Sequence, residues 1–327
     1  MWEQIKSNRI RSGVLMLAMC LLLLGLGYVV GLYFLGSIIG GLAIAAAIWI
    51  IMSLVTFFQG DNILLSISKA RKISKEDDPQ LYNIVEEMTI SSGLPKIPDV
   101  YIVNDTALNA FATGRNFNKA SVTVTSGLRA ALNRDELQGV IAHEISHIKN
   151  RDVLLMTVTS VMLGSIVIIS WYATRVMFWG GGKRSNSRDS GGAFQAVLMI
   201  VGLVLMILAP LFAQLIYFAI SRKREYLADA SAALYTRYPE GLASALDKLG
   251  NSTAQVKTAN KATAPMYIIN PFAKRSAINS WMSTHPPIAE RTRILRSMGG
   301  SSTLADYEKA YEQMHPGKNV LPKSEWE

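Results

Sequence analysis

Four long apolar runs, separated by polar stretches, dominate the pattern of this chain of 327 residues. The first two, at about 12–34 and 38–58, are joined by a Leu-Gly-Ser turn, and each is long enough to cross a bilayer as a helix. The third covers about 153–173, and the fourth covers about 193–220 with Pro210 as an expected kink. The pattern predicts an α-helical integral membrane protein with about four transmembrane helices.

Basic residues flank the first two runs. A secretory signal peptide is the competing interpretation of the first run, but this run is too long for a signal sequence and a second apolar run follows at once. Because cytosolic flanks of membrane spans are rich in lysine and arginine, we expect residues 1–58 to form a hairpin with both ends in the cytosol. The basic residues are Lys6, Arg9 and Arg11 before the hairpin, and Lys69, Arg71, Lys72 and Lys75 after it.

Residues 59–152 have the pattern of the first half of a soluble domain. Asp78, which precedes a proline, predicts a helix start, and Gly93 predicts the end of that helix. Asn133 and Glu136 form a capping box at the start of a longer helix, which leads into the third apolar run without an evident stop. Between these two helices, strands are expected at 99–103, 109–113 and 120–125.

The second half of the soluble domain is predicted at 221–327 and is mainly helical. It is separated from the first half by 153–220, which we interpret as two further transmembrane or membrane-embedded helices. A Gly- and Ser-rich linker at 180–192 joins those two helices. In the second half, helices are expected at 221–230, at 240–249, after a His-Pro-Pro start at 285–287, and at 304–314.

Composition supports the membrane assignment. Half of the residues are hydrophobic (50%), and only 17% are charged, below the usual quarter. The net charge of +9 is not gathered in one stripe but flanks apolar segments, so a lipid bilayer is expected as partner and nucleic acid is not. The single cysteine, Cys20, lies in an apolar run, so an intrachain disulfide is excluded and a metal would have His and carboxylate ligands.

The candidate chemistry is concentrated in one pentapeptide, His143-Glu144-Ile145-Ser146-His147. On a helix, the two histidines lie on the same face about one turn apart, so they can bind a single zinc ion from one side. Glu144 is rotated about a third of a turn from His143, so its carboxylate can reach a metal-bound water without ligating the metal. This is the H-E-x-x-H arrangement of zinc metallopeptidases, although a helix with two surface histidines would have the same residues.

A catalytic zinc site requires a third protein ligand and an open position for water. Glu225 and Asp229 are four residues apart after the fourth apolar run, so they face the same way on one helix. The glutamate can bind the metal while the aspartate accepts the free ring N–H of a ligating histidine. The alternative is a surface acid that pairs with Arg222 or Arg224. The presence of the pentapeptide favours the ligand.

Four motifs together resemble the HtpX-type membrane metallopeptidases, which are relatives of the CAAX prenyl protease and of the Oma-type mitochondrial protease. The resemblance covers nearly the whole chain in order, including the four apolar runs. It implies an α+β zincin-like (gluzincin-type) catalytic domain with one Zn²⁺ per chain. The motifs are Asn109–Asn116, His143–His147, Ser221–Asp229 and Ser283–Pro287.

The resemblance also implies a function. It indicates a zinc-dependent endopeptidase that cleaves misfolded or damaged membrane proteins as part of protein quality control and the stress response. The expected location is the bacterial inner membrane, with several membrane passes and the active site facing the cytoplasm. Other membrane quality-control proteases are possible partners.

Each polar residue of the motifs has an expected role. His143, His147 and Glu225 hold zinc, and Glu144 accepts a proton from the metal-bound water and later delivers it to the leaving amine. His285 is a candidate donor to the oxyanion, with a structural histidine at the Pro-Pro helix start as an equal alternative.

Two further polar residues are assigned more ordinary positions. Arg291 is expected on a solvated helix face, with pairing to an active-site carboxylate as the alternative. His315 precedes a proline in the polar tail and is expected to be exposed.

In metallopeptidases of the kind that this sequence resembles, an edge strand before the zinc helix pairs with the extended substrate peptide, a form of β-augmentation. Residues 109–113 are the candidate, with Asn109, Ala110 and Phe111 as substrate-binding residues and the Asn109 side chain bonded to the substrate backbone. An ordinary sheet strand is the alternative. Recognition through the backbone leaves side-chain preference loose, which suits a protease acting on misfolded chains.

The zinc site is expected at the membrane surface. The pentapeptide and Glu225 are separated by two apolar runs yet must meet at one metal, so the number of full crossings between them is none or two. The length of both runs favours two, although the basic residues of the intervening loop oppose it. His147 is also only five residues, or about 8 Å along a helix, from Asp152, which directly precedes the third apolar run.

Two other functions compete with the leading one. A CAAX-type prenyl protease is disfavoured because this chain has four apolar runs, whereas that protease has seven. A catalytically silent membrane scaffold that keeps zinc for stability is disfavoured by Glu144, since a structural site closes its fourth position and requires no base.

Overall fold

The computed structural model describes residues 36–158, 222–254, 266–269 and 285–321, with residues 161, 200, 204, 208 and 256 and short runs between 10 and 31. Parts of the first predicted apolar run, most of the third and fourth, and the Gly/Ser linker lie outside the described residues. The predicted number of four transmembrane helices depends on these parts of the chain.

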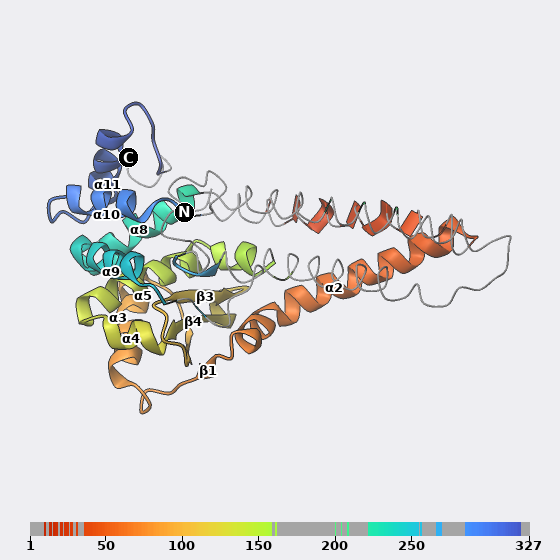
Figure 1. Cartoon of the computed structure of the whole chain (residues 1–327), viewed down its shortest axis with the longest axis horizontal. Helices are drawn as coiled ribbons and strands as arrows, with labels where there is room; N and C mark the ends of the chain where they lie inside the picture. Colours follow the sequence, from red (N-terminus) through yellow and green to blue (C-terminus); the bar gives the residue numbers. More distant parts are fainter. Residues whose placement is uncertain are drawn as a thin grey trace.

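Helix α2 (Ile38–Ile67) is the long apolar helix of the structure. It begins at Ser37, whose side chain accepts a hydrogen bond from the backbone N–H of Gly40. Among the described residues it is the one helix long and apolar enough to cross a membrane. Figure 1 shows α2 running away from the body of sheet and helices. Its exposed apolar side chains are Ile39, Ile44, Ile48, Ile50, Ile51, Leu54, Val55, Phe57, Phe58 and Ile67.

The last turns of α2, beyond the predicted end at residue 58, pack on the soluble body. Leu64 and Leu65 are buried in one apolar cluster with Phe111 and Tyr267. Gly60 lies against Thr157, and a Cβ placed on this glycine would be 2.8 Å from the threonine methyl carbon. The membrane helix is therefore an integral part of the body, not a tether joined to it by a linker.

The sheet has four strands in the order β1-β2-β4-β3. Strand β2 (Asp99–Val103) pairs in parallel with β4 (Ala120–Thr125), and β3 (Ala110–Gly114) pairs antiparallel with β4 on its other side. The three predicted strands are present. Strand β1 (Arg71–Lys72) was not predicted, because two exposed basic residues carry no apolar alternation.

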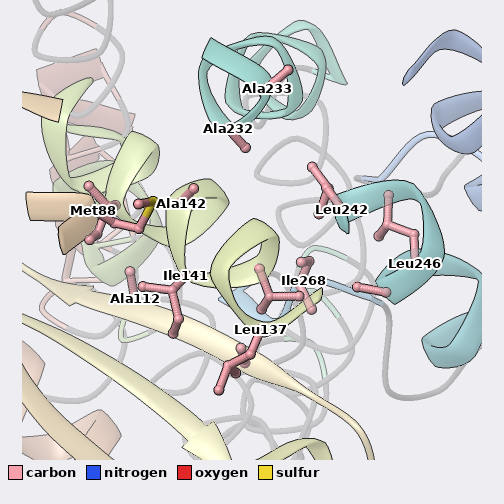
Figure 2. Close-up of a cluster of buried hydrophobic side chains, with 14 of the residues drawn as sticks. Met88, Ala112, Leu137, Ile141, Ala142, Ala232, Ala233, Leu242, Leu246 and Ile268 are labelled. Carbon is pink, nitrogen blue, oxygen red and sulfur yellow. The ribbon is translucent and has the colours of Figure 1, made fainter. Parts of the chain in front are cut away.

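The helices surround one central helix, α5 (Arg134–Lys149). The predicted capping box of Asn133 and Glu136 starts it, with both reciprocal hydrogen bonds present. Figure 2 shows Ile141 of α5 beside Ala112 of β3, and Ala142 beside Met88 of α3. The other helices are α3 (Pro79–Ser92), α4 (Ser126–Ala131), α8 (Arg222–Thr236), α9 (Pro239–Asn251), α10 (Ile288–Ser297) and α11 (Leu304–Met314), with a short 3-10 turn at Phe117–Lys119.

Close contact between α5 and α9 depends on a glycine. A Cβ on Gly139 of α5 would lie 2.6 Å from the backbone nitrogen of Leu242, so any larger residue would push the two helices apart. The small residues Ala232 and Ala233 of α8 are fully buried on another side of the same core. The two halves of the soluble domain, which are far apart in sequence, thus meet through tightly packed helices.

The predicted continuation of the zinc helix into the third apolar run was wrong. Helix α5 ends at Lys149, Asn150 caps it, and Arg151 has a φ of +57°, in the left-handed region that helices do not use. A new helix covers 152–158. The break between the two helices changes the direction of the chain and brings Asp152 back towards the side chains of α5.

Candidate metal centre

Three buried side chains from two helices converge at one point. His143 and His147 of α5 and Glu225 of α8 offer ligand atoms that all lie within 4.8 Å of one another. The Nε2 atoms of the two histidines are 3.2 Å apart, and the Glu225 carboxylate lies 3.7 Å from one and 3.6 Å from the other. Glu225 is only 3% exposed, so it is not the surface acid that the alternative interpretation required.

An aspartate beside each imidazole sets the orientation of its ring. The Asp229 Oδ1 atom is 3.0 Å from Nδ1 of His143, as the four-residue spacing from Glu225 predicted. On the other ring, Asp152 Oδ2 is 3.0 Å from Nδ1 of His147. If each Nδ1–H donates to its aspartate, both Nε2 lone pairs face the centre. The role of Asp152 was missed because only the left-handed turn before it brings the carboxylate back to His147.

Arg291 of α10 contacts the acids of this centre, Asp229 and Glu225. It was expected on a solvated helix face, and that prediction was wrong, because its side chain is fully buried. Its Nε and Nη2 donate to Asp229 at 2.8 and 2.7 Å, and its Nη1 lies 3.7 Å from Glu225. Its Nη2 is also 3.4 Å from Nδ1 of His143, but two N–H donors do not bond each other, so Asp229 accepts from both.

Burial and charge act against each other on the acids of the centre. Burial disfavours the charged form of Asp229, but the guanidinium of Arg291 outweighs this and lowers the pKa of that carboxyl below its usual value. For Glu225, burial is likewise outweighed by the nearby imidazoles of His285, His143 and His147, and the pKa falls well below its usual range. Positive charge next to these two buried carboxyl groups thus favours their ionised form.

The residues present fit a zinc ion. Two nitrogens bound tetrahedrally at zinc distances are separated by about 3.3 Å, close to the 3.2 Å between the two Nε2 atoms. Without a cation these two lone pairs would repel each other. Within the described part of the chain, Oε2 of Glu225 is buried with no hydrogen-bond partner. Buried carboxylate oxygens ordinarily have a partner, and a metal ion would provide one here.

The charges of the buried side chains around the centre also favour a bound cation. Among the described residues around the centre, four buried carboxyl groups outnumber two buried guanidinium groups, and this surplus of acidic groups favours a bound cation. The four acids are Glu144, Asp152, Glu225 and Asp229, and the two bases are Arg224 and Arg291.

Glu144 lies next to the three-residue cluster without joining it. Its side chain is almost fully buried, and within the described residues neither carboxylate oxygen has a hydrogen-bond partner. Burial raises the pKa of this carboxyl above its ordinary value. The side chain is therefore a carboxylate without a structural partner, and it is available to exchange a proton with a bound molecule.

The two remaining histidines differ in their distance from the centre. His285 is buried, and its Nε2 lies 3.9 Å from Glu225 Oε2, so the structure brings it to the cluster. His315 was expected to be exposed, which was wrong. It stacks on Tyr311 with ring centroids 4.4 Å apart and forms an ion pair of 3.2 Å with Glu290, because α11 packs against α10.

The predicted substrate strand has a neighbour. Phe111 of β3 forms an antiparallel bridge with Tyr267, and the backbone N–H of Ile268 donates to the carbonyl of Ala110 at 3.0 Å. The Asn109 side-chain amide donates to the Ile269 carbonyl at 3.3 Å. The groups that were predicted to bind a peptide backbone are therefore bonded to a segment of the chain itself, 266–269.

The chain is similar in sequence to known peptidases. The profile of Peptidase family M48 matches residues 75–299. A Protease HtpX homolog of Dictyoglomus turgidum is 44% identical over 308 residues, which cover 94% of this chain and 98% of the relative. One from Streptococcus gordonii is 41% identical over 298 residues, which cover 91% and 100%. The crystal structure of S. mikatae Ste24p aligns with a TM-score of 0.48 at 19% identity, over 90% of this chain and 67% of that one.

The orientation of the His147 ring can be tested through Asp152. Asp152→Asn replaces the charged acceptor by an amide, whose NH2 group can donate to Nδ1 and favour the wrong ring tautomer, so zinc affinity should fall by roughly 10- to 100-fold. Competition with a zinc-chelating dye measures the affinity in detergent. Asp135→Asn, at an exposed aspartate in the first turn of α5, the helix of His147, is the matched control and should leave the affinity unchanged. Equal affinity of Asp152→Asn and wild type would contradict the assignment.

Proposed function

The chain belongs to peptidase family M48, and on this basis we propose that it is a zinc endopeptidase that hydrolyses misfolded or damaged membrane proteins at the cytoplasmic face of a bacterial inner membrane. Membership makes it a membrane-bound zinc metalloprotease with protein substrates. The observation that carries the finer proposal is the buried group of His143, His147 and Glu225, with an unpartnered carboxylate, Glu144, beside it.

The proposed ligands are His143, His147 and Glu225. When bound, zinc supplies a Lewis acid that polarises an amide carbonyl and makes a water molecule more acidic. The chain's own contribution is to hold the three ligands in place before binding. Asp229 and Asp152 orient the two rings.

Glu144 is the proposed general base. Its carboxylate takes a proton from the attacking water and later delivers it to the leaving amine, which makes the departure of the amine favourable. The absence of a hydrogen-bond partner within the described residues supports this role, because a carboxylate engaged in a structural bond would first have to break it.

His285 is the proposed donor to the oxyanion that develops on the substrate carbonyl. Its burial beside the proposed ligand Glu225 supports the role, since a donor in a site shielded from water stabilises charge more strongly. A structural role at the start of α10 is the alternative.

The two roles of His285 predict different results for His285→Ala. A donor would lower kcat by roughly 10²- to 10³-fold while zinc content and the thermal midpoint stay unchanged. A structural histidine would lower the thermal midpoint together with kcat. Steady-state kinetics, metal analysis and thermal unfolding of the same preparation decide between them.

The membrane boundary is proposed at Phe57 and Phe58 of α2. The guanidinium of Arg115 lies over both rings and donates to the Phe57 carbonyl at 3.1 Å. Ile38–Thr56 would then span about 28 Å, close to the hydrocarbon thickness of a bilayer. Basic residues beside this end, such as Arg71 and Lys72 of β1, support a cytoplasmic position for it by the positive-inside rule.

This orientation can be tested by labelling. A cysteine at Glu312, exposed on α11, should react with a membrane-impermeant maleimide only after the inner membrane is opened, in a variant that also carries Cys20→Ser. A cysteine at Ser37, which lies at the start of α2 on the opposite side, should react in intact spheroplasts. The reverse pattern would contradict a cytoplasmic active site.

The alternatives predict other substrates or none. A CAAX-type prenyl protease would require a prenylated substrate, whereas the proposed enzyme cleaves an unfolded protein without a lipid. A silent scaffold that keeps zinc for stability would leave Glu144 without a role. The unpartnered state of this buried carboxylate favours a catalyst over a scaffold.

Glu144→Gln tests the proposed function most simply. The amide keeps the size of the side chain but accepts no proton, so cleavage of an unfolded protein such as casein should fall by about 10²- to 10⁴-fold while zinc content is unchanged. The rate is measured in detergent with zinc added. Glu312→Gln, an exposed change on α11, is the control and should keep wild-type activity. Equal cleavage by wild type and Glu144→Gln, or none by either, would rule out the mechanism.

A further inference from the structure

The segment 266–269 lies against the outer edge of β3 and pairs with it through one isolated antiparallel bridge. Phe111 and Tyr267 are paired in antiparallel register, and the bonds of Ile268 to Ala110 and of Ile269 to Asn109 continue the pairing on one side. The backbone bond between Ile268 and Ala110 is of the kind that an extended peptide makes when it is added to the edge of a sheet, and the Asn109 side chain adds a second bond to the backbone of the segment. Within the part of the chain that the structure describes, this edge of β3 is thus already occupied.

The occupied edge lies beside the metal centre. The Ile268 carbonyl accepts a hydrogen bond of 3.3 Å from Arg291 Nη1. The same guanidinium holds Asp229 and lies 3.7 Å from Glu225. A single side chain therefore joins the segment 266–269 to the residues of the centre, so a peptide in its place would pass directly beside that centre.

The side chains around the segment define what would fit there. The Tyr267 ring meets Phe111 edge-on, with centroids 5.2 Å apart and planes at 77°. Both lie in an apolar cluster that also contains Leu64, Leu65 and Met156. Ile268, the next residue, is buried in the main core instead, so neighbouring side chains point to different apolar surroundings. The place accepts extended chain with consecutive large apolar residues.

We propose that residues 266–269 occupy the substrate-binding edge of β3 as an internal peptide, which an apolar, aromatic-containing segment of the substrate replaces. The proposal rests on the proposed function and adds a substrate class to it. The incoming strand lies antiparallel to β3 with an aromatic side chain against Phe111. Such segments are buried in folded membrane proteins and become accessible when those proteins misfold.

The exchange requires that one strand replaces another with similar bonds. The Ala110 carbonyl and the Asn109 amide would bond the substrate backbone in place of residues 268 and 269, and Arg291 would bond a substrate carbonyl. Because each buried polar group keeps a partner after the exchange, none is left unsatisfied. A polar or charged segment would not replace the buried side chains of 266–269, so it would not be bound.

A reversible cross-link tests whether the segment must leave. In a Cys20→Ser background, Phe111→Cys with Tyr267→Cys places two cysteines at a directly opposed antiparallel pair, where a disulfide can form. Oxidation should lower kcat/KM on casein by roughly tenfold or more, and a phosphine reductant should restore it in the same sample. The same variant with Glu144→Gln should bind a labelled apolar peptide when reduced and lose it when oxidised.

Lys72→Cys with Tyr101→Cys is the matched control at the opposite edge of the sheet. This pair is also antiparallel, and the bond from Ile73 to Val100 flanks it in the same way as the bond from Ile268 to Ala110 flanks the first pair. Oxidation of the control should change neither cleavage nor peptide binding. Unchanged cleavage after full oxidation of the Phe111 and Tyr267 pair would overturn the proposal without touching the proposed function. Inactive wild type would contradict the proposed function instead.

A peptide comparison gives an independent result should the loss of the Phe111 ring inactivate the reduced pair. The sequence of residues 264–270, Ala-Pro-Met-Tyr-Ile-Ile-Asn, is added to the Glu144→Gln protein as a labelled peptide. Replacing its tyrosine by aspartate should weaken binding by roughly tenfold or more, because a charge cannot be buried against Phe111. Equal binding of the two peptides would overturn the proposal.

Discussion

The junction of α5 and α8 around one cation is the interaction on which the other features of the structure depend. His143 and His147 come from one helix and Glu225 from the other, so neither helix can form the centre alone. Around this centre, the buried acids of the described residues outnumber the buried guanidinium groups, so a cation would contribute to the charge balance of the folded core as well as to the chemistry.

The packing around this junction follows from that requirement. Gly139 lets α9 approach α5 until backbone touches backbone, and the alanines of α8 do the same on another side. Arg291, from α10, closes the network by holding Asp229, and the position of α10 is thereby linked to the orientation of the His143 ring. The end of α2 packs against β3, so the membrane helix and the centre belong to one packed body.

Sequence periodicity was sufficient for the residues whose relation is local. His143 with His147, and Glu225 with Asp229, are four apart on helices, and a helix fixes which side chains share a face. Asp152 was missed because its place depends on the left-handed conformation of Arg151, and an arginine at this position does not predict that conformation. Arg291 was misjudged because an arginine is ordinarily exposed, and its burial follows only from partners far away in the sequence, the acids of α8 and the carbonyl of Ile268.

The pairing of 266–269 with β3 was beyond sequence reasoning for a similar reason. A single bridge between distant segments has no periodicity, and short apolar stretches are compatible with several partners. Strand β3 itself was predicted from local pattern, and its position at the edge of the sheet was predicted from the resemblance to metallopeptidases. In the sheet order, β3 is the last of the named strands, as predicted. The segment 266–269, however, lies on the outer side of β3.

Zinc stoichiometry of purified protein tests the central claim most directly, namely that α5 and α8 close on one ion. Metal analysis of protein prepared without chelators should find one zinc per chain in the wild type and in Glu144→Gln. It should find none retained through gel filtration in Glu225→Ala, which keeps both histidines but lacks the carboxylate of α8. Wild-type zinc content in Glu225→Ala would show that the ion is held without α8 and would contradict the account.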